Sequence, residues 1–125
     1  MFSNSVIEHV GDGATQSRFA SEAMRVGRRF WVQTPNRWFP VEQHMLTPFV
    51  HLMPRVLSAL IVRRFTVWQW THKPTEDRRQ SYVEHFLRDI RLLTATDMRR
   101  LFPGAQIRKE RFLLFTKSLI AWKND

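Results

Sequence analysis

Polar side chains that could bind a ligand or move a proton gather in three groups in the N-terminal part of this chain. The first group is Ser3, Asn4, Ser5, Glu8 and His9. The second group is Thr34, Asn36 and Trp38, and the third is Glu42 and His44. Carboxylates and imidazoles are common general acids and bases, hydroxyls and amides bind polar ligands, and an indole offers a flat apolar surface.

The first two groups each end a stretch that is typical of a β-strand. Met1 to Val10 reads as a buried strand that runs into a polar loop, and Arg29 to Thr34 is rich in aromatic and β-branched residues. Between them, Thr15 to Val26 has helical spacing, with Gly27 as its stop. A strand, a helix and a strand in this order predict a parallel pair. Ligands bind at the carboxyl ends of such strands, so both groups are candidates for a binding site.

A second interpretation of the first group needs no ligand. Ser3 and Ser5 would bond to backbone groups of the loop, and Glu8 and His9 would form a helix cap. The residues favour neither interpretation over the other.

The third group follows the second strand. Glu42 and His44 would share a face of an extended segment, where they could form a general base pair or polar anchors. His44 and His51 would share a helical face, but no third ligand has a recognisable spacing, so structural histidines are favoured over a metal site. The chain has no cysteine, which excludes disulfides and thiolate chemistry. It also lacks the G-x-S-x-G motif of serine hydrolases.

The rest of the chain predicts mostly helices and a final hairpin. An aromatic and apolar insert covers about 37–73, with Val56 to Arg64 as its most continuous helix. Apolar spacing predicts a helix over Arg78 to Leu93, and Thr96 is the expected N-cap of another helix that ends at Pro103. Ala105 to Trp122 predicts an antiparallel hairpin. We therefore expect a single α/β domain over residues 1–125, with a mixed sheet of about four strands and helices on its faces.

The charge balance is strongly basic, with 20 Lys and Arg against 11 Asp and Glu and a formal net charge of +9. This excess suggests a nucleic acid or an anionic membrane surface as a partner, although arginine doublets such as Arg28-Arg29 also occur at solvated ends of helices. Met45 to Val62 is apolar but is interrupted by prolines and a charge, so we expect a buried helix or an interfacial lid and no membrane span. No signal peptide is visible, and we expect a cytoplasmic protein.

Three stretches together resemble a known family. They are FSNSVIEHV, SEAMRVGRRFWVQTPNRWFPVEQH and LLTATDMRRLFPGAQIRKERFLLFTKSLIAW. In order and spacing they resemble the C-terminal half of a class I S-adenosylmethionine-dependent methyltransferase of the small-molecule type. The resemblance implies that Met1 to Val10 is the fourth strand of the Rossmann-like sheet, Arg28 to Thr34 the fifth, and Ala105 to Trp122 the terminal hairpin.

The resemblance also implies roles for the three groups. Ser3, Asn4 and Ser5 would face the methionine part of S-adenosylmethionine, with Glu8 and His9 near the cofactor or substrate. Thr34, Asn36 and Trp38 would contact the acceptor, and Glu42 and His44 would be catalytic. The apolar insert suggests a small hydrophobic acceptor.

The Gly-rich cofactor loop of this family has no counterpart here, because the chain's glycines are Gly11, Gly13, Gly27 and Gly104. The resemblance thus implies that the N-terminal cofactor-binding half is missing, and we expect little activity from this chain by itself. It also implies that Phe2 to Ile7 lies at a sheet edge, where self-association is expected. The competing hypothesis is a basic module that binds nucleic acid or an anionic membrane without catalysis.

Overall fold

The structure is a computed structural model that describes residues 1–42, 47–49, 52–64, 75, 77–78, 80–81, 84 and 90–124. The chain forms two compact units. The first unit joins Met1–Phe39 to Asp89–Asp125, and the second is Pro40–Arg88. The second unit contains most of the segment predicted as an insert.

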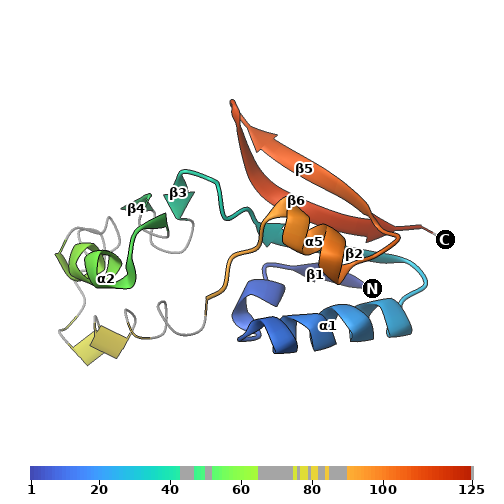
Figure 1. The fold of residues 1–125 in the computed structure, drawn as a ribbon, viewed down its shortest axis with the longest axis horizontal. Coiled ribbons are helices and arrows are strands. Elements are labelled where there is room, and N and C mark those ends of the chain that lie inside the picture. Colours follow the sequence, from blue (N-terminus) through green and yellow to red (C-terminus); the bar gives the residue numbers. More distant parts are fainter. Residues whose placement is uncertain are drawn as a thin grey trace. The chain divides into compact units, whose positions relative to one another are not determined.

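The first unit is built on a four-stranded mixed sheet with the order β1-β2-β6-β5 (Figure 1). The strands are β1 (Phe2–Asn4), β2 (Phe30–Pro35), β5 (Gln106–Phe112) and β6 (Phe115–Lys123). β1 runs parallel to β2, whereas β6 is antiparallel to both β2 and β5. This arrangement confirms the predicted α/β fold, with a parallel pair and an antiparallel C-terminal hairpin.

Helix α1 (Gly13–Val26) connects the two parallel strands. It begins earlier than the predicted Thr15 because the Asp12 carboxylate caps it, accepting the Thr15 amide at 2.8 Å. Hydrogen bonds from the amide and hydroxyl of Thr15 lower the pKa of Asp12. The helix ends at the predicted glycine, where the Gly27 amide donates to the Ala23 carbonyl.

Helix α5 (Ala95–Leu101) precedes the hairpin, and the prediction of its cap was wrong. The N-cap is Thr94, and Thr96 lies inside the helix. Thr94 and Asp97 form a reciprocal capping box, in which the Asp97 amide donates to the Thr94 hydroxyl and the Thr94 amide donates to the Asp97 carboxylate. Thr96 has no such partner three residues ahead in the sequence.

The core of the first unit lies between these helices and one face of the sheet. Its buried residues from the helices and their ends include Ala20, Ala23, Met98 and Phe102, and those from the sheet include Phe30, Val32, Leu119 and Ala121. Because side chains alternate along a strand, the intervening residues Trp31 and Trp122 belong to the other face. Both helices of the first unit therefore pack on the same side.

The second unit contains two short strands, β3 (Val41–Glu42) and β4 (Thr47–Pro48), and helix α2 (Arg55–Arg64). Helix α2 confirms the helix predicted from Val56. In the predicted helix over Arg78 to Leu93, residues 78, 80, 81 and 84 are helical, but Ile90 to Leu93 are not. Leu93 instead forms a parallel bridge with Asn36, so this end of the prediction was wrong. The other residues of this predicted helix, 79, 82–83 and 85–89, lie outside the described part of the chain.

Candidate functional site

The carboxyl ends of β1 and β2 lie at the same end of the sheet, because the strands are parallel and Asn4 pairs with Gln33. The chain turns sharply after β1 at Ser5, which has a φ of 54° that few residues other than glycine adopt. The Ser5 amide donates to the Gln33 carbonyl at 3.0 Å, and its hydroxyl donates to the Asn4 side chain at 3.2 Å. Asn4 and Ser5 are exposed, so they remain accessible to a ligand.

Glu8 follows in the short 3₁₀ helix η1 (Ile7–His9) and is fully buried. Its Oε2 accepts the Thr34 hydroxyl at 2.9 Å. Its Oε1 lies 4.0 Å from His9 Nε2, and no described residue donates a hydrogen bond to it. Burying a carboxyl group is costly unless it is hydrogen-bonded. The contact with Thr34 therefore fixes η1 against β2, which makes Glu8 a positioning residue in this structure.

Two further segments hold η1 in place. The Gln16 side chain of α1 donates to the carbonyls of Ile7, at 3.2 Å, and Arg91, at 3.0 Å. The Arg91 amide in turn donates to the Glu8 carbonyl at 2.9 Å. The loop after β1 is thus connected to both α1 and the segment that leads to α5. These hydrogen bonds hold in position the loop that carries the exposed residues Asn4 and Ser5.

The remaining strand-end residues divide into anchors and exposed groups. Asn36 is buried, and its side chain donates to the Thr116 carbonyl at 2.9 Å, which attaches the end of β2 to β6. Ser3 is also buried, and its hydroxyl has no hydrogen-bond partner among the described residues. His9 is exposed, and Trp38 is 63% exposed with the Arg37 guanidinium 6.0 Å from its ring centroid.

The predicted catalytic pair lies in the second unit. Glu42 belongs to β3, where only its backbone is described, and His44 lies outside the described residues, as does His51. The structure brings the first group to the end of β2 through Glu8 and Thr34, whereas the third group stays a prediction.

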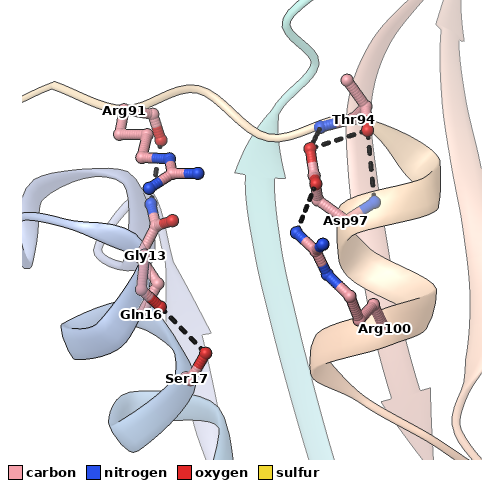
Figure 2. Close-up of polar contacts among 7 residues, drawn as sticks. All are labelled: Gly13, Gln16, Ser17, Arg91, Thr94, Asp97 and Arg100. Atoms are coloured by element: carbon pink, nitrogen blue, oxygen red, sulfur yellow. Dashed lines mark hydrogen bonds and ion pairs between the residues drawn. The ribbon is translucent and has the colours of Figure 1, made fainter.

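A groove with a volume of about 280 Å³ lies between α1 and α5 (Figure 2). Its polar lining includes Gly13, Gln16, Ser17, Arg91, Asp97 and Arg100. The Arg91 guanidinium lies so close to the start of α1 that a Cβ on Gly13 would come within 2.5 Å of Nη1. None of the exposed strand-end residues lines this groove. This groove was not predicted from the sequence, in which the T-x-x-D pattern at Thr94 is the one local signal for it.

The groove contains an ion pair between Asp97 and Arg100, whose Oδ1 and Nη2 atoms are 3.0 Å apart. Burial by itself raises the pKa of Asp97. Hydrogen bonds from Thr94 and the charge of Arg100 outweigh burial, with a further contribution from Arg91, so the pKa lies below its usual value. Since this carboxylate is already bonded to Thr94 and Arg100, the groove is best explained by helix capping.

Two other kinds of site find no support within the described ranges. No group of three or more His, Asp or Glu residues there is placed to hold a metal ion. In the same part of the chain, no helix has the length and apolar character needed to cross a membrane.

Comparisons of the chain with protein-family models, with curated proteins and with solved structures found no match.

Proposed function

We propose that this chain forms part of an S-adenosylmethionine-dependent methyltransferase that acts on a small hydrophobic acceptor. The observation that carries the proposal is the exposed Asn4-Ser5 loop at the carboxyl ends of two parallel strands, held in place by the buried Glu8–Thr34 hydrogen bond. Ligands of open α/β sheets bind at this end of the strands. The terminal antiparallel hairpin of the sheet fits the same family.

The strand-end residues suit the methionine end of the cofactor. Its ammonium and carboxylate groups need short polar partners, which the Asn4 amide and the Ser5 hydroxyl supply. When bound, the cofactor supplies an electrophilic methyl group on a sulfonium centre. Because this chemistry depends mainly on the alignment of donor and acceptor, fixed strand ends are more important than a strong catalytic group.

On the acceptor side, the proposal assigns a contact with the acceptor to Trp38 of the first unit. Trp38 offers an exposed ring, whereas the side chains of Thr34 and Asn36 are already hydrogen-bonded within the protein and act as supports. Taken by itself, the second unit exposes Val56, Leu57 and Leu60 on helix α2, and these apolar side chains agree with the apolar insert predicted from the sequence. Glu42 and His44 are the proposed bases for acceptors that lose a proton. The absence of cysteine agrees with a reducing cytoplasm, where we place the protein.

Nuclear magnetic resonance titration of the chain with S-adenosylmethionine tests the proposal. We expect weak binding, with a dissociation constant on the order of 1 mM, because the Gly-rich loop has no counterpart in this sequence. The amides of Asn4, Ser5 and His9 should shift, and the N4A/S5G variant should lose these shifts. Glycine at position 5 keeps the positive φ accessible.

The control for this titration is Ser21→Ala, which changes an exposed serine on α1 away from the strand ends. It should leave the shifts unchanged. An absence of shifts at the strand ends at millimolar cofactor, or shifts that persist in N4A/S5G, would contradict the proposal.

Self-association through β1 is part of the same proposal. β1 is an edge strand of the sheet, and its first residue, Phe2, is 72% exposed. Edge strands without charge or proline pair readily with another chain. Light scattering on the titration samples should detect association at concentrations of tens of micromolar, and a clean monomer there would contradict this part.

A further inference from the structure

The tip of the β5–β6 hairpin exposes four consecutive apolar residues. Phe112, Leu113, Leu114 and Phe115 are 57%, 83%, 94% and 51% exposed. Phe112 pairs with Phe115, so the two leucines form the turn itself. The hairpin extends beyond α1 and α5, which leaves this tip away from the core of its unit (Figure 1). We call these four residues the apolar tip.

The turn sequence is poorly suited to the turn. Leu113 has a φ of 54°, the left-handed region that two-residue hairpins normally fill with glycine, asparagine or aspartate. A leucine is strained there, and exposed leucines also reduce solubility. Local strain and exposed apolar surface at one place indicate a function outside the fold.

Basic residues follow the apolar tip along both strands of the hairpin. The hairpin carries Arg108, Lys109, Arg111 and Lys117, and its one acidic residue in this stretch, Glu110, accepts a hydrogen bond from Gln33 at 3.0 Å. Apolar side chains at a projecting end, followed by cations, match the boundary between the acyl chains and the anionic headgroups of a bilayer.

Nucleic acid fits the tip less well. Cations near the tip could contact phosphates, but the two most exposed residues, Leu113 and Leu114, have neither a hydrogen-bonding group nor a flat ring for a base. The exposure of these two leucines would then remain unexplained.

We propose that the β5–β6 hairpin docks this protein on an anionic membrane surface, with the apolar tip inserted among the lipids and Arg111 and Lys117 against the headgroups. The proposal does not depend on methyltransferase activity. It concerns a surface far along the chain from the strand-end loops, and its test needs no cofactor.

Vesicle co-sedimentation of the full chain tests this proposal. The protein should bind vesicles of phosphatidylcholine mixed with phosphatidylglycerol and bind poorly to phosphatidylcholine alone. The L113G/L114N variant should bind the mixed vesicles about tenfold more weakly or worse, because it removes the most exposed apolar groups. It also has a sequence suited to the turn, so it should fold at least as well. The R111Q/K117Q variant should weaken binding severalfold and reduce its sensitivity to salt.

The matched control is Val26→Asn, which changes an apolar residue that is 66% exposed at the end of α1 and should retain binding. Circular dichroism confirms that each variant is folded. The proposal is overturned by full binding of L113G/L114N, by equal binding to both kinds of vesicle, or by a loss of binding in the control. Tight, salt-sensitive binding to a DNA oligonucleotide without binding to vesicles would also overturn it.

Discussion

Glu8 and Leu114 depart from the usual distribution of residues in opposite directions. Glu8 is a charged residue type with no exposed surface, whereas Leu114 is apolar and 94% exposed. Fully buried carboxylates are rare, and a run of large apolar side chains at the surface is unusual. Glu8 has a hydrogen-bond partner in Thr34 and belongs to the fold, whereas Leu114 lies outside the core cluster. Glu8 should therefore be necessary for the stability of the fold, whereas Leu114 should be dispensable for it.

The largest expected effect comes from breaking the buried contact on one side. Thr34→Val removes the hydroxyl that donates to Glu8 and leaves a buried carboxyl group without that bond. We expect a loss of about 3 kcal/mol in the free energy of unfolding, measured by urea denaturation. The double variant E8L/T34V should recover most of this loss, because replacing both partners with apolar groups removes the unpaired polar atom.

Thr96→Val is the control for this prediction, since Thr96 is exposed on α5 and its change should stay within about 0.5 kcal/mol. If Thr34→Val costs no more than the control, the Glu8–Thr34 bond does not hold the strand ends.

A substitution in the hairpin turn should change the free energy of unfolding in the opposite direction. Leu113→Gly relieves the strain of a left-handed leucine, so we expect the free energy of unfolding to rise by about 1 kcal/mol. Leu114→Asn, at the neighbouring position, should be close to neutral. Thermal unfolding followed by circular dichroism measures both changes. Destabilisation by Leu113→Gly would mean that the apolar tip contributes to the fold, and the contrast with Glu8 would fail.

An effect of similar size separates the two threonines near the start of α5. Thr94→Ala removes the capping hydroxyl and should cost about 1 kcal/mol, whereas Thr96→Ala should cost much less. Equal costs for the two changes in urea unfolding would contradict the assigned cap.

The capping box should also be sensitive to pH. Because the pKa of Asp97 is lowered in the folded state, its contribution to stability is present above the unfolded pKa of about 3.9 and is lost as the pH falls through the folded value. Asp97→Asn should therefore lower stability at neutral pH and have less effect in strong acid. An effect that is the same at both pH values would remove the electrostatic part of the explanation.

Local signals in the sequence predicted most of the first unit. Gly27 marked the end of α1, and the β-branched and aromatic residues of β2 identified a strand. The helix predicted to reach Leu93 was too long because a buried residue in an extended segment happened to continue the apolar spacing. Apolar spacing records burial, and burial occurs in extended segments as well as in helices.

The contacts of the candidate site could not be predicted in the same way. Glu8 and Thr34 are 26 residues apart, and their hydrogen bond depends on the parallel register of β1 and β2. The Gln16–Arg91 bond spans 75 residues. The sequence placed Glu8 near the strand ends, but a pattern of residue types does not distinguish a buried carboxyl group from an exposed one.

The bridge between Asn36 and Leu93 has a consequence for how this chain tolerates change. The Arg37 amide donates to the Leu93 carbonyl at 3.0 Å, so the polypeptide leaves the first unit and returns to it through two adjacent backbone segments. For the first unit, the segment between Arg37 and Leu93 acts as a loop whose two ends are held together. The entropic cost of closing such a loop grows slowly with its length. Insertions or deletions in the intervening segment can therefore accumulate with little cost to the sheet. The sequence of the second unit can thus change, and with it the ligand that it prefers, while the carboxyl ends of β1 and β2 keep their geometry.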